Sequence, residues 1–161
     1  ASSGFVYNVA YRVIGNQEDA QEVTQEVFMS IYNKLKDFRF QSSFKTWVYR
    51  ITANQAINRS KKESKTRNKT SAFDEQIDPP AVEADVKTKI DKEDNERKVE
   101  ELLNELNPDQ RACVILRNME GLSYEEIAQS LNININTVRS RLKRARERLL
   151  EVKKQVGYGQ L

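Results

Sequence analysis

The sequence of 161 residues has no histidine, one cysteine, one tryptophan and three prolines. Without histidine, the chain cannot form a zinc site of Cys and His ligands or a Ser-His or Cys-His catalytic pair. Cys113 is alone, so an internal disulfide is excluded. No run approaches the roughly 18 apolar residues that a membrane span needs, and no apolar signal segment opens the chain. These absences indicate a cytoplasmic protein that does not insert into a membrane and lacks most hydrolase chemistry. We also expect no catalytic residue, metal site or cofactor.

Apolar residues recur at intervals of three and four along most of the chain, which is the period of an amphipathic helix. The N-terminal third predicts a helix that ends before Gly15, a second over about 17–38 and a third from Phe44, capped by Ser42 or Ser43. The apolar line of the second helix is Ala20, Val23, Val27, Phe28, Ile31, Leu35 and Phe38.

Between about residues 61 and 95 apolar side chains are sparse, and Pro79-Pro80 interrupts any helix, so we expect a flexible linker. Charge is unevenly distributed along the chain. The stretch from Lys45 to Lys69 carries a net charge of +7, against +3 for the whole sequence.

Helical periodicity returns over about 99–106, and Asn107-Pro108 begins a further helix that ends at Gly121. Ser123 and Glu126 form a capping box that opens a short helix, and a final helix follows after a turn. The sequence therefore predicts an all-α protein of two small helical domains joined by a flexible linker. Cys113 lies beside an apolar helix face and is predicted to be a small buried side chain.

The last two predicted helices have the layout of a helix-turn-helix. Ala128 is small enough for a close crossing, which Ile133 and Val138 can fill. Basic residues of the final helix suit the major groove, where an Arg fork matches guanine and Lys or Arg neutralises phosphates. These residues are Arg139, Arg141, Lys143, Arg144, Arg146 and Arg148. A solvated cationic helix face is the alternative interpretation.

Four blocks of sequence, in order, resemble the extracytoplasmic-function (ECF) sigma factors of the sigma-70 superfamily. Residues 15–28 and 44–51 are similar to sigma region 2, and residues 125–128 and 136–147 are similar to region 4. The resemblance implies region 2 over 1–62, a linker over 63–95 and region 4 over 96–156. Asn136 stands where many family members have glycine. The start of the first region 2 helix is absent and the chain begins at Ala1, so we expect N-terminal residues of region 2 to be missing.

The resemblance implies a subunit that is not an enzyme but binds core RNA polymerase and directs it to promoter DNA. The implied polymerase contacts are the β′ clamp helices and the β flap, and family members are often held inactive by an anti-sigma factor that clamps both domains. On this resemblance, the minus-35 element is contacted by Asn136, Thr137, Arg139, Ser140, Arg141, Lys143 and Arg144.

The loop before Phe44 and the helix after it mix aromatic, basic, hydroxyl and amide groups, as sites for single-stranded DNA do. In the family this loop takes a flipped base of the minus-10 element. A core position for Trp47 and a simple helix connector for the loop are the alternatives. The expected minus-10 residues are Phe40, Gln41, Ser42, Ser43, Lys45, Trp47, Arg50 and Asn54.

The predicted helix over 17–38 has a polar stripe opposite its core, which suits a partner helix with basic residues. In the family the matching surface meets the β′ clamp helices, and an ordinary solvated helix face is the alternative. The expected polymerase-binding residues are Asp19, Glu22, Gln25, Glu26 and Met29.

Two other classes of protein compete with this interpretation. A response-regulator-type activator shares the helix-turn-helix but needs an upstream α/β phosphoacceptor domain, whereas the N-terminal third has helical periodicity. A helical adaptor would use its basic helix to bind acidic proteins. Promoter-directed transcription with added core polymerase separates the three classes.

Overall fold

The computed structural model describes residues 2–69 and 87–156, and all regular structure within these ranges is helical. The prediction of an all-α protein is confirmed. No helix in the described ranges is long and apolar enough to cross a membrane. The helices are α1 (Ser2–Ile14), α2 (Gln17–Lys34), α3 (Phe44–Lys69), α4 (Lys87–Asn104), α5 (Pro108–Val114), α6 (Tyr124–Leu131) and α7 (Ile135–Val156), with a 3-10 turn η1 (Leu35–Asp37) and a π-helical turn η3 (Ile115–Met119).

The helices run further into the predicted linker than the apolar pattern indicated. Helix α3 continues through Lys69, and α4 already begins at Lys87. Both extensions are rich in charged residues, so helix propensity rather than apolar burial determines their length. Pro79-Pro80, and with it the expected flexible connection, lies outside the described residues.

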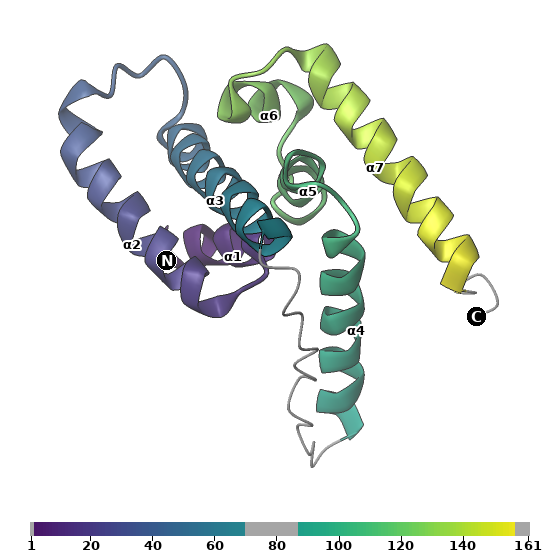
Figure 1. The fold of residues 1–161 in the computed structure, drawn as a ribbon. Coiled ribbons are helices and arrows are strands. Elements are labelled where there is room, and N and C mark those ends of the chain that lie inside the picture. The colour runs from purple at the N-terminus through teal and green to yellow at the C-terminus, as the bar shows by residue number, and fades with distance from the viewer. Residues whose placement is uncertain (1, 70–86, 157–161) are drawn as a thin grey trace.

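Helices α1, α2 and α3 pack against one another and form the first half of the molecule (Figure 1). Gly15 takes φ 80° between α1 and α2, a left-handed conformation that glycine adopts without strain. The side chain of Asn16 then caps α2 by accepting a hydrogen bond from the Asp19 amide at 3.2 Å. The apolar period predicts more buried residues in this segment than the structure has. The side chains of Phe28 and Leu35 are 38% and 52% exposed.

Helices α4 to α7 form the second half. Asn107 and Gln110 make a capping box around Pro108 at the start of α5. The predicted box at α6 is confirmed: the Ser123 hydroxyl accepts from the Glu126 amide at 3.1 Å, and the Glu126 carboxylate accepts from the Ser123 amide at 3.0 Å. These reciprocal bonds satisfy backbone donors that a helix N-terminus leaves free, and so fix where each helix begins.

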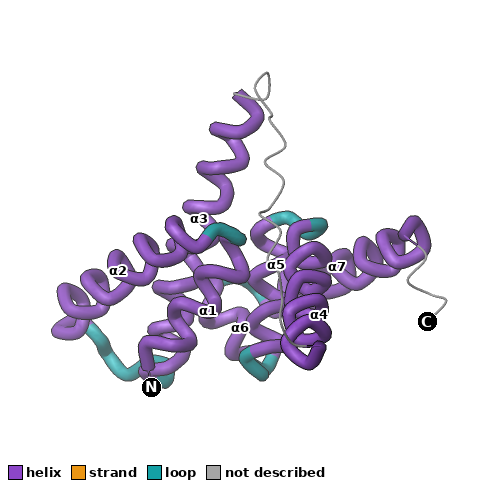
Figure 2. Tube along the Cα trace, turned by 90° about the horizontal axis from the view of Figure 1, so that it is seen from below, coloured by secondary structure: helices purple, strands orange, loops and turns teal. Residues whose placement is uncertain are grey.

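The two halves share one apolar core. Helix α3 packs along α6, and α1 packs on α5 (Figures 1 and 2). At the boundary the buried Tyr49 hydroxyl donates to the Glu120 carboxylate at 3.1 Å, and Lys61 pairs with Asp109 at 3.0 Å. Burial and the neighbouring Glu120 carboxylate raise the pKa of Tyr49 above its usual range, so this phenol stays protonated and can donate.

The buried side chain of Arg111 forms hydrogen bonds with both halves. Its side chain is buried and donates to the carbonyls of Leu103 and Leu106 at 2.8 and 2.9 Å, and also to the carbonyl of Val13 in α1. Two of these acceptors lie at the end of α4, where the partial negative charge of the helix C-terminus favours a cation. Nothing in the sequence pattern distinguishes Arg111 from the other basic residues.

Candidate nucleic-acid interface

Helices α6 and α7 form the predicted helix-turn-helix. Asn132 ends α6 in the left-handed conformation with φ 55°, and the Asn134 side chain accepts from the Asn136 amide at 2.8 Å at the start of α7. Val138 is fully buried and Ile133 is partly buried beside it, as the predicted crossing requires. The turn is therefore fixed by local hydrogen bonds and by apolar packing.

The side of α7 opposite its buried residues is polar and open to solvent. Asn136, Arg139, Ser140, Lys143 and Arg144 are exposed there, and Thr137 is half-buried. We call these six residues the α7 face. The guanidinium of Arg139 donates to the Asn136 side chain at 3.1 Å, and the Ser140 hydroxyl donates to the Asn136 carbonyl at 2.9 Å.

Three of the predicted basic residues of α7 do not lie on the α7 face. Arg141 lies 3.8 Å from the Asp109 carboxylate, and Arg148 pairs with Glu105 at 2.8 Å. Arg146 lines a groove between α7 and α4. The sequence placed all of these on one basic face with Arg139 and Arg144, but each of the three lies on a side of α7 that meets other helices.

The loop before α3 borders an open hollow of about 360 Å³. Four of the expected minus-10 residues line it together with four neighbours from the first half, and α6 closes one side. We call this the α3 hollow. Its lining residues are Asp37, Phe38, Arg39, Gln41, Ser42, Thr46, Trp47 and Arg50, with Gln129 and Asn132 from α6.

An aromatic cluster contributes Phe38 and Trp47 to the lining of the α3 hollow. Phe38 packs against Phe40, Phe44 and Trp47 in tilted or edge-on geometry, with ring centroids 4.7 to 5.9 Å apart. Phe40 is 84% exposed and has φ 56°, a conformation that costs a bulky residue energy. Trp47 is half-buried, so it both packs in this cluster and reaches the hollow.

The remaining minus-10 candidates have other positions. The Ser43 hydroxyl accepts from the Thr46 amide at 3.0 Å, which makes Ser43 the cap of α3. The Lys45 ammonium lies 5.8 Å from the centre of the Tyr49 ring. Asn54 is half-buried on α3, one turn beyond Arg50.

The expected polymerase surface lies on α2. Glu22, Gln25, Glu26 and Met29 are exposed, and Met29 is 67% exposed. The structure adds a cation that the sequence analysis missed. Arg59 of α3 pairs with three carboxylates at once, with Asp19 at 3.3 Å, Glu22 at 2.9 Å and Glu26 at 3.1 Å. The hydrogen bond that Arg59 donates to the Glu22 carboxylate is the main cause that raises the pKa of Arg59.

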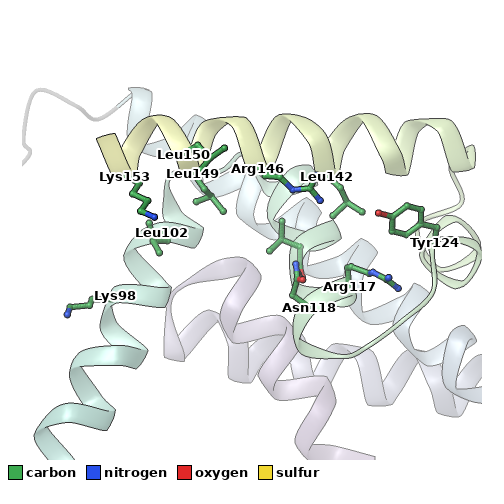
Figure 3. Close-up of a pocket in the computed structure, with 11 residues that line it drawn as sticks. Lys98, Leu102, Arg117, Asn118, Tyr124, Leu142, Arg146, Leu149, Leu150 and Lys153 are labelled. Carbon is green, nitrogen blue, oxygen red and sulfur yellow. Dashed lines mark hydrogen bonds between the residues drawn. The ribbon is translucent and has the colours of Figure 1, made fainter. Parts of the chain in front are cut away.

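A second concave surface, of about 610 Å³, lies between α4, α5 and α7 (Figure 3). Leucines from α4 and α7 form its floor, and Leu150 is 52% exposed there. Lys98, Arg117, Arg146 and Lys153 surround these leucines with positive charge (Figure 3). We call this the α4–α7 groove. Its residues come from α4, α5, η3, α6 and α7, so the periodicity of any one helix does not reveal it.

Cys113 is fully buried, as predicted, and burial raises its pKa to about 11. Its thiol therefore stays protonated at neutral pH. Within residues 2–69 and 87–156 there is no cluster of three His, Cys, Asp or Glu side chains that could hold a metal ion.

Comparison with known proteins matches each half to one family model. Sigma-70 region 2 matches residues 1–66, and Sigma-70, region 4 matches residues 96–149. The two regions in this order define a sigma-70-type protein. The chain belongs to the ECF RNA polymerase sigma factors within that class.

Individual relatives agree with this family. The ECF RNA polymerase sigma factor SigE of Mycolicibacterium smegmatis is 33% identical over 89% of this chain, and the match spans 55% of that relative's length. The ECF RNA polymerase sigma-E factor of Escherichia coli is 37% identical over 80% of this chain and 71% of its own. Among solved structures, the sigma factor RpoE of Bartonella quintana, in complex with the anti-sigma factor NepR, has a TM-score of 0.69 and 26% identity, covering 94% of this chain and 91% of that one.

Proposed function

We propose that this chain binds core RNA polymerase in the cytoplasm and directs it to promoters, as an ECF sigma factor does. Polymerase carries out the nucleotidyl transfer, and this chain supplies positioning and capture of the DNA strand. One observation carries the proposal: a polar, basic α7 face and an aromatic-lined α3 hollow occur on the two matched sigma regions of one chain.

The α7 face is assigned to the minus-35 element. Its Arg139 and Arg144 are exposed and can present guanidinium forks to guanine or phosphate. Replacing either with alanine is expected to cost about 1–3 kcal/mol of promoter binding. Arg148→Ala is the matched control, because that arginine is paired with Glu105 away from the face. Equal losses for the control and for Arg139→Ala would contradict the assignment.

The α3 hollow is assigned to an unpaired base of the minus-10 element. Phe40 offers an exposed ring for stacking, and Gln41 offers an amide for the base edge. Because Ser43 is occupied as the helix cap, the sharper test is Gln41→Ala, with the exposed Gln21→Ala as its control. We expect Gln41→Ala to reduce base preference at one position on a pre-melted template. If Gln41→Ala keeps the wild-type preference among the four bases, the loop is only a connector between helices.

The carboxylates of α2 are assigned to core polymerase. Glu22→Gln with Glu26→Gln should weaken assembly with core, while stability changes by less than about 1 kcal/mol because these ion pairs are exposed. Arg59→Gln is an informative control, since it breaks the same pairs but keeps the carboxylates. Equal loss of assembly in both variants would mean that the ion-pair network, and not direct contact, matters.

The α4–α7 groove is assigned to the β flap, the second polymerase contact that the family resemblance implies. Its leucine floor and basic rim fit an apolar helix with acidic edges. Leu150→Glu should therefore weaken binding to polymerase, and Val156→Glu is a matched control with 60% exposure outside the groove. An anti-sigma factor is a further partner that we propose for this chain. Competition between such a factor and core polymerase for the wild-type chain would support this.

Run-off transcription with purified core polymerase and a promoter library tests the proposal as a whole. The wild-type chain should select promoters with shared upstream elements. An activator or a protein-binding adaptor would confer no such selection on core polymerase alone. Absence of promoter-directed transcripts would refute the proposed function.

A further inference from the structure

The loop that joins η1 to α3 at one end of the first half contains a residue that its backbone conformation does not favour (Figure 1). Two non-glycine residues of the described ranges have a positive φ, Asn132 at 55° and Phe40 at 56°. Asparagine visits this left-handed conformation readily, because its short polar side chain can hydrogen-bond locally. A bulky phenylalanine is strained there, and strain of this kind concentrates at functional sites.

Packing within the described part of the chain offsets little of this strain. The Phe40 ring lies 4.7 Å from the Phe38 ring between centroids, yet Phe40 remains 84% exposed. Arg39 and Gln41 line the α3 hollow, whereas Phe40 between them does not. The Phe40 ring therefore stands at the rim of the α3 hollow, supported on one side by Phe38, which does line it.

An exposed ring beside a site for an unpaired base has a suitable contact close at hand. A base that leaves the duplex opens a gap of about one nucleotide step, 3.4 Å, and uncovers the face of the next base pair. Apolar side chains such as phenylalanine can fill such a gap and hold the bases unstacked. Consecutive Cα atoms are about 3.8 Å apart, so Phe40 lies about one nucleotide step from Gln41.

We propose that the Phe40 ring enters the gap left by the captured base and stacks on the base pair at the edge of the remaining duplex. This inference rests on the proposed function, and it gives Phe40 a contact different from that of Gln41. Gln41 discriminates the captured base inside the α3 hollow, whereas Phe40 is a positioning residue that holds the junction between duplex and melted strand. A ring that is already exposed needs no rearrangement to meet the base pair.

The test uses holoenzyme assembled from the full chain and core polymerase, with two DNA templates. One is a fork junction, in which the single-stranded minus-10 element continues from a duplex edge, and the other is the same strand without the duplex. Phe40→Gly should weaken binding to the fork junction about tenfold, which is within the range for losing one base–aromatic stack. Binding to the single strand should equal that of the wild type, because it offers no base pair. Phe40→Tyr keeps a ring and should bind both templates as the wild type does.

Gln41→Ala is the matched control, because Gln41 is next to Phe40 but lines the α3 hollow. It should lose base preference on both templates, whereas Phe40→Gly should keep the wild-type preference on both. A 2-aminopurine in the base pair at the duplex edge reports the proposed stack directly, because stacking quenches its fluorescence. Holoenzyme with the wild-type chain or Phe40→Tyr should quench this probe, and holoenzyme with Phe40→Gly should not.

Thermal melts separate this contact from a packing role. Phe40→Gly should melt no lower than the wild type, because glycine adopts a positive φ without strain. A clearly lower melting temperature would make Phe40 a packing residue and overturn the inference. An equal deficit of Phe40→Gly on both templates would place the ring on the melted strand, and an unchanged affinity for the fork junction would leave it without a DNA contact. Either result would also overturn the inference.

Failure of this inference differs from failure of the proposed function. If wild-type holoenzyme binds the fork junction specifically and Phe40→Gly equals it, the Phe40 contact alone is refuted. If the wild-type chain gives no promoter-specific binding with core polymerase, the proposed function is refuted as well.

Discussion

Replacing Arg111 with methionine tests whether the two halves are held together from within. The buried guanidinium donates to the carbonyls of Val13, Leu103 and Leu106, which come from the first half and from the end of α4. Hydrogen bonds that involve a charged group contribute about 1.5–3 kcal/mol each, and these energies are not additive. Methionine keeps much of the volume but makes none of the bonds. We expect the free energy of unfolding to fall by about 3–5 kcal/mol, a large part of the roughly 5–15 kcal/mol typical of a domain.

Urea denaturation followed by circular dichroism measures this change. The control is Arg117→Met, because Arg117 is exposed and donates to a single carbonyl, that of Leu122, at 2.9 Å. Its cost should be only about 1 kcal/mol, because water screens the exposed Arg117 side chain and its contact with the Tyr124 ring at 4.9 Å. Arg111→Lys should fall between the two, since one ammonium cannot reach three separate carbonyls. If Arg111→Met lowers the free energy of unfolding by less than about 1 kcal/mol, the reasoning is refuted. Removing a charged donor from three buried carbonyl acceptors should cost more than that.

Two further predictions concern the second half. Asn136→Ala should reduce preference for the base that we propose Arg139 reads about two- to tenfold while the salt slope stays constant, because the Asn136 side chain holds that guanidinium at 3.1 Å. Binding selections on randomised minus-35 sites measure this, and a uniform loss on every sequence would contradict it. The raised pKa of Cys113, about 11 against 9.0, predicts that stability is full below pH 9 and falls as the pH rises towards 11, since the unfolded thiol loses its proton first. Urea melts of wild type and Cys113→Ala between pH 8 and 11 check this, and parallel pH profiles for the two would contradict it.

Local signals in the sequence were sufficient for the starts of α5, α6 and α7. Asn107, Ser123 and the turn before α7 each combine a capping side chain with an adjacent apolar period, so the helix start depends on a few neighbouring residues. The buried position of Cys113 followed from the same period. Such features need no knowledge of what packs against the helix, which is why they could be predicted.

The arrangement of the two halves could not be predicted in this way. Periodicity shows that a helix has an apolar face but not which other helix covers it. Tyr49 illustrates the limit, because its burial depends on α6 and on Glu120, which is 71 positions away in the sequence. Arg59 shows the same for charge, since it faces three carboxylates of α2 that are 33 to 40 positions away.

The basic residues of α7 show why a charge run alone does not define a DNA surface. In sequence, Arg139, Arg141, Arg144 and Arg148 are equivalent members of one cationic stretch. In the structure, Asp109 lies beside Arg141 and Glu105 beside Arg148, so these two cations hold α7 against α5 and the end of α4. A nearby carboxylate offsets the positive potential of an arginine. Such an arginine therefore attracts a phosphate less strongly than an exposed arginine does. The division of one stretch into two arginines paired with carboxylates and two exposed ones therefore depends on where α5 and the end of α4 place their acids.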